Sequence, residues 1–279
     1  MTYTELVTAV QDYCENTFPT ADMDTMIRQA EQNIYNTVQI ANLRKNVTGS
    51  LTVGNKYLSC PNDFLSVYSL AVYAVLTPTG TGTSGQSTIV VSSATGIVSG
   101  MYVTGNGIGT GATVSSVSGT TVTLSVANSG TVSGTITFQG DYLYLLNKDV
   151  NFMREAYPNP SFKGTPRYYA IFGPQSNDVN ELSFILGPTP DLSYNAELHY
   201  YYYPESIVDV QTTWLGDNFD TALLNGVMME AITYMKGEKE MVDLYATRYT
   251  QAISLLKNLG DGKQRMDAYR DGQVRIPVK

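Results

Sequence analysis

Charge is missing from one long stretch of this sequence. Between Asp63 and Asp141 there is no lysine, arginine, aspartate or glutamate, so all 17 basic and all 25 acidic residues lie outside that stretch. Most of it is Thr, Ser, Gly and Val, which favour strands separated by tight turns. We therefore predict an inserted antiparallel β-domain over residues 77–140, made soluble by hydroxyl groups. Its β-branched segments are Ile89–Val91, Thr113–Val114, Thr121–Leu124 and Thr135–Phe138.

Cysteine, histidine and long apolar runs are also scarce. The two cysteines, Cys14 and Cys60, lack CxxC spacing, so neither a disulfide framework nor a zinc site is expected. A single histidine, His199, cannot build a metal site made of histidines. No apolar run reaches the roughly 18 residues that a membrane span needs, and no signal peptide is recognisable. We expect no cofactor, no metal and no membrane contact.

The net charge sets limits on nucleic-acid binding. At pH 7 the formal charge is −8, and the isoelectric point is about 4.6. A protein that grips phosphate backbones over a broad surface carries the opposite sign. An acidic wall beside DNA would repel the phosphates and leave the DNA mobile.

Helices are predicted at both ends of the sequence. Apolar residues three and four apart indicate a helical hairpin within Thr4–Ile40, with Thr4 as the first cap and the second helix starting near Asp22 or Asp24. A second pair is predicted at Asn218–Met235 and Lys239–Leu259. Asp217 is the expected cap of the first of these helices, and Gly260 is expected to end the second.

Strands are predicted between the helical segments. A short helix should carry Phe152, Met153 and Arg154. The predicted strands are Gly49–Leu58, Phe64–Leu76, Arg167–Phe172, Leu182–Leu186 and Ala196–Tyr203. The fold class is therefore α+β: a helical bundle made of the N-terminal hairpin and the C-terminal helix pair, an antiparallel β-sheet, and an inserted small all-β domain. The predicted divisions are a main domain in two parts, 1–76 and 141–260, the insertion 77–140, and a C-terminal arm, 261–279.

The predicted arm has the opposite charge to the rest of the protein. Residues 261–279 hold five basic and three acidic side chains, and Gly262, Gly272 and Pro277 disfavour regular structure. Such a segment suits docking on an acidic neighbour and ordering on contact. A solvated chain end is the other interpretation.

The sequence gives only weak support for a catalytic site. His199 lies in a tyrosine-rich segment, where a place on a strand face is a simpler explanation than a role as general base. The GxGxxA match at Gly107, Gly109 and Ala112 precedes β-branched residues rather than a helix, which argues against a dinucleotide site. Helix ends explain two acidic pairs better than acid/base chemistry: Asp217 with Asp220, and Glu238 with Glu240. We expect no enzyme activity.

Four consecutive tyrosines form a candidate interface. Tyr200, Tyr201, Tyr202 and Tyr203 would point to both faces of a strand. Tyrosines on both faces favour a sheet packed on one side and a subunit or tail protein on the other. Stacking of sugars or bases is the alternative.

Several segments together resemble a known family. They are Thr4–Ile40, Tyr57–Phe64, Phe152–Pro158, Tyr168–Phe172, Gly187–Pro190, Tyr202–Pro204, Trp214–Asp217, Lys236–Glu238 and the basic tail. In these the chain resembles the head-tail adaptor proteins (head-completion or connector proteins) of tailed bacteriophages. The resemblance covers nearly all of the chain outside the insertion, although its motifs are structural patterns rather than chemical signatures.

The resemblance implies a structural role in the virion. Such adaptors form a ring, usually of twelve copies, under the portal protein, assembled in the host cytoplasm and located in the neck between capsid and tail. The ring continues the DNA channel toward a tail or nozzle protein, and DNA passes without specific binding. In such adaptors the C-terminal arm reaches the portal. Carried onto this sequence, the expected portal contacts are Lys263, Arg265, Tyr269, Arg270 and Arg275.

Two other function classes stay open. The first is a receptor- or glycan-binding tail component that uses the inserted β-domain. The second is a tail-associated lytic enzyme, which would need a catalytic carboxylate pair or histidine site that the sequence does not supply.

Overall fold

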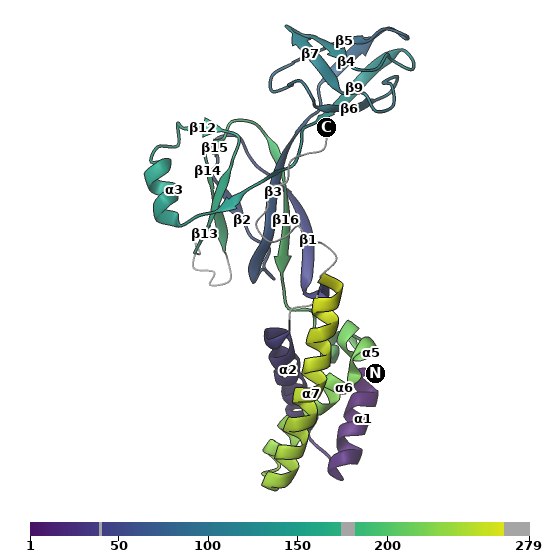
Figure 1. Ribbon diagram of the computed structural model, residues 1–279, viewed down its shortest axis with the longest axis vertical. Coiled ribbons are helices and arrows are strands. Elements are labelled where there is room, and N and C mark those ends of the chain that lie inside the picture. The colour runs from purple at the N-terminus through teal and green to yellow at the C-terminus, as the bar shows by residue number, and fades with distance from the viewer. Residues whose placement is uncertain (39–40, 174–181, 265–279) are drawn as a thin grey trace. The chain divides into compact units, whose positions relative to one another are not determined.

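The computed structural model describes residues 1–38, 41–173 and 182–264 (Figure 1). The chain divides into two compact units, here called the helical unit (Met1–Lys45 with Tyr201–Lys279) and the β-unit (Asn46–Tyr200). Helices dominate the first, and strands dominate the second. The predicted α+β class is confirmed.

The helical unit joins the two ends of the sequence. Its elements are α1 (Tyr3–Cys14), α2 (Thr20–Thr37), the 3-10 turn η1 (Ala41–Leu43), α4 (Ile207–Val210), α5 (Trp214–Asn218), α6 (Asp220–Tyr234) and α7 (Lys239–Gln264). The central helix is α6, which packs against α1, α2, α5 and α7. It is apolar nearly all round because it is surrounded by other helices. Its Gly226 lets Ala30 of α2 and Tyr249 of α7 come close.

Several predicted helix boundaries were wrong. Helix α1 is capped by Thr2, not Thr4: the Thr2 hydroxyl accepts from the Glu5 N–H, and the Glu5 carboxylate accepts from the Thr2 N–H. Helix α2 begins at Thr20, before both predicted aspartates. Asp217 lies inside α5 and does not cap α6, which has no side-chain cap. The predicted C-terminal pair exists, but α7 continues past Gly260 to Gln264.

The β-unit contains three sheets and a short helix. Its elements are β1 (Arg44–Ser50), β2 (Tyr57–Ser59), β3 (Ser66–Leu76), β4 (Thr79–Gly82), β5 (Thr88–Val91), β6 (Tyr102–Gly105), β7 (Val114–Ser118), β8 (Thr121–Leu124), β9 (Val132–Gln139), β10 (Leu143–Tyr144), β11 (Leu146–Asn147), α3 (Val150–Ala156), β12 (Lys163–Gly164), β13 (Tyr168–Phe172), β14 (Ser183–Gly187), β15 (Thr189–Pro190) and β16 (Tyr194–Tyr201). The single predicted strand Gly49–Leu58 is wrong, since β1 ends at Ser50 and β2 begins at Tyr57.

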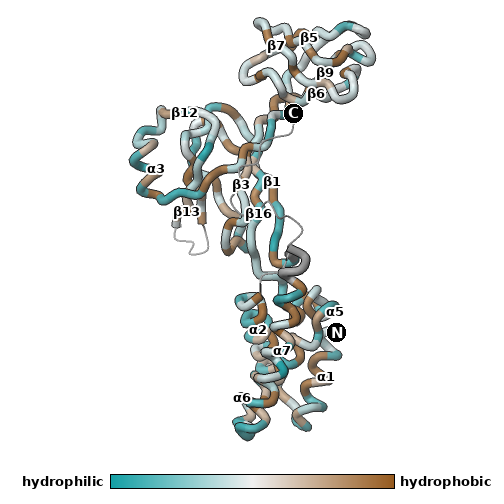
Figure 2. Tube along the Cα trace, viewed as in Figure 1, coloured by the Kyte–Doolittle hydropathy of each residue, from teal (hydrophilic) through white to brown (hydrophobic). Residues whose placement is uncertain are grey.

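The largest sheet has the order β1-β16-β3-β9-β4-β5-β8-β7, with β10 paired to β3 and β6 paired to β9. Three of the four predicted β-branched segments of residues 77–140 fall on strands β5, β8 and β9, and Val114 of the fourth begins β7. The pairings of these strands are antiparallel as predicted. The Thr- and Gly-rich strand β4 and the strand β6 were missed. Strand β9 pairs with β4 near its start and with β3 and β6 near its end. In Figure 2 this region is pale, with brown stretches along its strands.

The second sheet has the order β11-β13-β14-β2 and carries α3 on one face. A small apolar cluster of Met153, Ala170 and Ile185 joins α3 to this sheet. Gly187 of β14 lets the helix approach, because a Cβ there would lie 2.7 Å from the methyl carbon of Met153. The predicted short helix with Phe152, Met153 and Arg154 is confirmed.

Candidate assembly surfaces

The predicted portal-contact residues lie mostly beyond the described part of the chain. The backbone of Lys263 belongs to α7, but its side chain is outside the described residues. Arg265, Tyr269, Arg270 and Arg275 are outside them altogether. Their role as portal contacts stays a prediction.

Tyr200 is an internal residue of the β-unit. Only 2% of its surface is exposed, and its hydroxyl donates to a carboxylate oxygen of Asp63 at 2.8 Å. Its ring lies 5.9 Å from that of Phe64. Within one chain, therefore, this tyrosine serves the packed side of β16.

The next three tyrosines belong to the helical unit. The guanidinium of Arg44 lies 5.5 Å from the Tyr201 ring centroid, and the Lys45 ammonium lies 5.1 Å from that of Tyr202. Such contacts between a cation and an aromatic face stabilise both partners. Tyr203 is 39% exposed and donates a hydrogen bond to Asn36. Of the four predicted interface residues, it offers the most accessible ring, and the interface itself stays a prediction.

His199 lies on the outward side of β16. One of its ring nitrogens is 3.2 Å from the carboxylate of Glu197, which also accepts from the Asn46 amide at 3.1 Å. The hydrogen bond from His199 is the main reason that the pKa of Glu197 is lowered. The interpretation of His199 as a strand-face residue is confirmed.

The glycines of the GxGxxA match have a packing role. A Cβ on Gly107 would lie 2.6 Å from the carbonyl oxygen of Thr131, and one on Gly109 would lie 2.5 Å from that of Ala127. The next regular element is strand β7, so no helix N-terminus is available for a phosphate. The expectation that a strand rather than a helix follows these glycines is confirmed.

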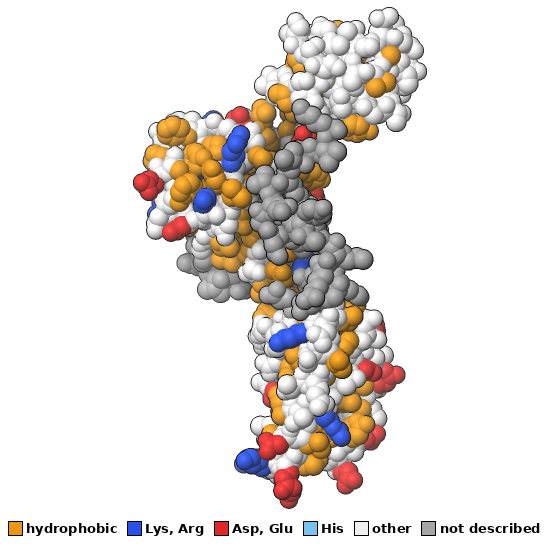
Figure 3. Space-filling view, in the orientation of Figure 1, with side chains coloured by type: hydrophobic (Ala, Val, Ile, Leu, Met, Phe, Trp, Pro, Cys, Tyr) orange, Lys and Arg blue, Asp and Glu red, His pale blue; other side chains and the backbone are white. Residues whose placement is uncertain are grey.

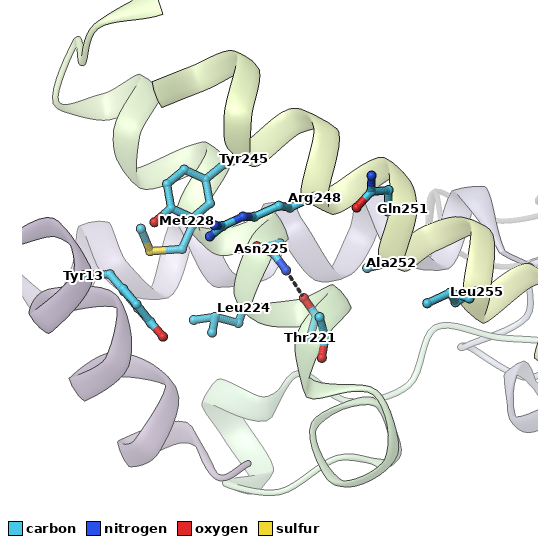
Figure 4. A pocket seen from close by; sticks show the side chains of 10 residues that line it. All are labelled: Tyr13, Thr221, Leu224, Asn225, Met228, Tyr245, Arg248, Gln251, Ala252 and Leu255. Atoms are coloured by element: carbon cyan, nitrogen blue, oxygen red, sulfur yellow. Dashed lines mark hydrogen bonds between the residues drawn. The ribbon is translucent and has the colours of Figure 1, made fainter. Parts of the chain in front are cut away.

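A groove lies between α1, α6 and α7, with a cavity volume of about 360 Å³. Figure 4 shows Tyr13 of α1 and Leu224 of α6 on one side, with Arg248 of α7 extending toward Tyr245 and Met228. Asn225 is 9% exposed and donates to the Thr221 carbonyl oxygen at 2.7 Å. The groove is mainly apolar, which suits a side chain from another protein surface.

One edge of this groove is the outer side of α7. Glu240, Asp243, Leu244 and Leu255, here called the α7 stripe, lie on that side because helical residues three and four apart share a face. Leu244 is 42% exposed and Leu255 is 62% exposed. Among the described residues, neither carboxylate of the stripe forms an ion pair. The negative charge lies at the Glu240 end of the stripe, beside Leu244. Between Leu244 and Leu255 comes Arg248, whose guanidinium lies 5.5 Å from the Tyr245 ring centroid.

A surface of opposite character surrounds α3 in the β-unit. It consists of Leu146, Lys148, Phe152 and Arg154, here called the α3 surface. Leu146 is 60% exposed and Phe152 is 38% exposed. Figure 3 shows hydrophobic side chains gathered over this part of the molecule, with basic side chains among them and acidic ones at its edge.

The cations of the α3 surface lie over aromatic rings. The Lys148 ammonium is 5.3 Å from the Phe152 ring centroid and 5.9 Å from that of Tyr168. The Arg154 guanidinium is 5.8 Å from that of Phe172. In the described part of the chain, no carboxylate pairs with Lys148 or Arg154. The sequence pattern predicts a helix at Phe152 and Arg154 but no surface there. The signal for one is that, apart from Lys56, every basic residue of the β-unit falls within residues 148–167.

A buried carboxylate joins distant parts of the helical unit. Glu31 of α2 is 3% exposed, and it accepts from the Ile207 N–H of α4 at 2.9 Å. Burial raises its pKa above the usual value. Beside it, Arg28 donates two hydrogen bonds to Asp209, at 2.8 and 2.9 Å. No sequence pattern singled out Glu31, because its partner is 176 positions away.

The described residues also bear on metal binding and membrane insertion. Within the described ranges, no three His, Cys, Asp or Glu side chains gather where a metal ion could be held. No helix of the described chain has the length and apolarity needed to cross a membrane.

The chain matches the model of a known protein family. The family described as SU10 adaptor protein matches residues 1–146 and, in a second alignment, residues 77–277. Together the two alignments cover nearly the whole chain and overlap in the charge-free insertion. No curated protein matches the chain.

Proposed function

This chain belongs to the SU10 adaptor protein family, and we propose on that basis that it forms an oligomeric ring joining the portal to the tail. The family is one of phage structural adaptors, so the chain is a structural component of the virion. The proposed location is the neck between capsid and tail, and the proposed partners are the portal and a tail or nozzle protein. The family match over both parts of the chain is the observation that carries the proposal.

Ring formation is supported by the different character of the two units. A closed ring uses head-to-tail contacts, in which one surface of a subunit meets a different surface of the next. The helical unit carries the acidic and aliphatic α7 stripe, whereas the β-unit carries the basic and aromatic α3 surface. A ring of twelve copies is the proposed assembly.

Portal contact is assigned to the C-terminal segment. Residues 1–45 and 201–264 carry 15 acidic and 8 basic side chains, while residues 265–279 carry four basic and two acidic ones. The proposed contacts are Lys263, Arg265, Tyr269, Arg270 and Arg275. A basic segment attached to an acidic unit can reach an acidic partner and order on binding, so that adaptors would be added after the portal has assembled.

DNA is proposed to pass through the ring without specific binding. The net charge of −8 supports an acidic channel wall, which would repel phosphates and keep the DNA mobile. This function requires no reaction, and structural neighbours account for His199, Glu197 and Glu31.

A truncation tests the portal contact. Removing residues 265–279 leaves every described residue of α7 in place. The full chain should co-sediment with its portal and appear as a ring in negative-stain images, and the truncated chain should bind at least about tenfold more weakly. Replacing Arg265, Arg270 and Arg275 together with Gln, at unchanged length, should give a similar loss. Equal portal binding by full and truncated chains would refute the assigned contact, and absence of any ring on the portal would refute the function.

A further inference from the structure

We propose that the α3 surface of one copy binds the α7 stripe of the next copy. The inference rests on the proposed ring and names the contact that would close it. The occupant is a second copy of this chain, because the same chain carries both complementary surfaces.

Charge complementarity supports the pairing. Lys148 and Arg154 are exposed cations without an ion pair among the described residues, and Glu240 and Asp243 are exposed anions in the same situation. Opposite charges on two surfaces steer them together and fix their orientation. The aromatic rings beneath the two cations restrict where the positive charge can lie.

Apolar side chains complete the match. Leu146 and Phe152 stand beside the cations of the α3 surface, and Leu244 stands beside the anions of the α7 stripe. Leu255 lies about three turns further along the same side of α7. The groove along α7 adds an apolar recess next to Leu255. Exposed apolar groups within a polar surround are typical of protein interfaces, and their burial supplies most of the binding free energy.

A nucleic acid is a poorer occupant of the α3 surface. Stacking of bases needs free aromatic faces, but Lys148 already lies over Phe152 and Tyr168, and Arg154 over Phe172. The β-unit also carries 8 acidic and 5 basic side chains, so its overall charge repels phosphates. The helical unit of another copy is acidic and present at equal concentration.

Two reciprocal charge reversals test the contact. Variant K148E/R154E makes the α3 surface acidic, and variant E240K/D243K makes the α7 stripe basic. Each variant alone then presents two surfaces of like charge and should self-associate at least about tenfold more weakly than the original chain. An equimolar mixture should recover association, because each surface again meets its opposite on the other variant.

Sedimentation velocity of the full chain over a concentration series, at low and high salt, provides the readout. The original chain should self-associate, and salt should weaken the association. Variant K239E/K257E is the matched control: both lysines are exposed on α7 outside the stripe, and the net charge changes as in K148E/R154E. Its association should equal or exceed that of the original chain. Circular dichroism checks that all variants are folded.

Several outcomes would overturn the proposal. The first is an original chain that stays monomeric up to about 1 mM, well above the Kd of a specific contact. The second is a pair of charge-reversed variants that each self-associate as strongly as the original chain. The third is an equimolar mixture of the two variants that does not recover association. Salt-sensitive binding of a labelled oligonucleotide that K148E/R154E abolishes, with self-association unchanged, would assign the surface to nucleic acid instead. If the variants still form rings on the portal, this contact fails while the proposed function stands.

Discussion

The helical unit and the charge-free insertion reach stable packing by different means. The helical unit has ionisable side chains both in its interior and on its surface. Glu31 is buried against α4, and Arg28 forms a surface ion pair with Asp209. The insertion has no ionisable acidic or basic side chain to use. Its buried polar residue is Asn128, which is 3% exposed and donates to the carbonyl oxygens of Thr83 and Thr88.

Close backbone approach replaces charge in the insertion. A Cβ on Gly80 would lie 2.6 Å from a methyl carbon of Ile136, and one on Gly82 would lie 2.8 Å from a methyl carbon of Ile89. Because Gly80 and Gly82 have no side chain, branched residues of neighbouring strands can pack directly against their backbone. We infer that the stability of the insertion depends on glycine positions and is nearly independent of pH, whereas that of the helical unit responds to titration.

The largest expected effect comes from Gly107→Ala. Gly107 has a φ of +81°, and a Cβ there would meet the backbone of Thr131 at 2.6 Å. Left-handed backbone and overpacking together should lower the free energy of opening of the insertion by about 2–4 kcal/mol. Hydrogen exchange of the β6 and β9 amides in the full chain measures this change.

Gly111→Ala is the matched control for that comparison. Gly111 has a similar φ of +75°, but no atom lies within 4 Å of a Cβ placed there. Gly111→Ala should lower the free energy of opening by only about 1 kcal/mol, the cost of placing alanine in a left-handed backbone conformation. Equal losses in the two variants would show that close approach at Gly107 contributes nothing. Protection of α2 and α6 amides should not change in either variant.

A middle-sized effect is expected at Glu31. Glu31→Ala leaves the buried Ile207 N–H without an acceptor, whereas Glu31→Gln keeps a carbonyl oxygen in place. The Ala variant should therefore be less stable than the Gln variant by about 1–3 kcal/mol. Urea unfolding followed by the fluorescence of Trp214, the single tryptophan and a residue of the helical unit, measures the difference. Equal stabilities would rule out the capping role.

The smallest expected effect is the pH dependence of the helical unit. Burial raises the pKa of Glu31 in the folded chain above its usual value of 4.5. The folded state then holds this proton more tightly than the unfolded state, so the contribution is complete below about pH 4.5 and is lost as pH rises through the folded pKa. Glu31→Gln should remove this part of the decline.

Unfolding of both proteins between pH 4 and pH 7, again followed by Trp214 fluorescence, provides the measurement. The stability of the Gln variant relative to the original chain should rise across this window. Parallel curves would show that Glu31 does not titrate differently in the two states. The insertion should show the same opening free energy at each pH once intrinsic exchange rates are corrected.

Local patterns predicted element types better than boundaries. Periodic apolar residues identified both helix pairs, and β-branched segments identified four strands of the insertion. The strand β4 was not predicted because Thr79–Gly82 contains no apolar side chain. Its Gly80 is buried only because neighbouring strands pack against it. The end of α7 was misplaced because Gly260 was expected to stop the helix, yet the helical backbone continues to Gln264.

Assembly surfaces were the least predictable part. The sequence marked the tyrosine run as an interface, but could not tell that Tyr200 faces inward to Asp63 while Tyr203 stays accessible. It showed where the basic residues of the β-unit lie, but not that Lys148 and Arg154 would both stand over aromatic rings around one short helix. Such groupings depend on strand register and helix placement.

The sequence alone determined the α+β class, the helical ends and four strands of the charge-free segment 77–140, because these follow from local periodicity and composition. Only the tertiary structure decided which side chains share a surface or a buried contact. Glu31 of α2 meets Ile207 of α4, and Lys148 lies over the ring of Tyr168 in β13, through packing between separate segments of the chain. Long-range contacts arise from the free energy of the whole fold, and local patterns do not encode them.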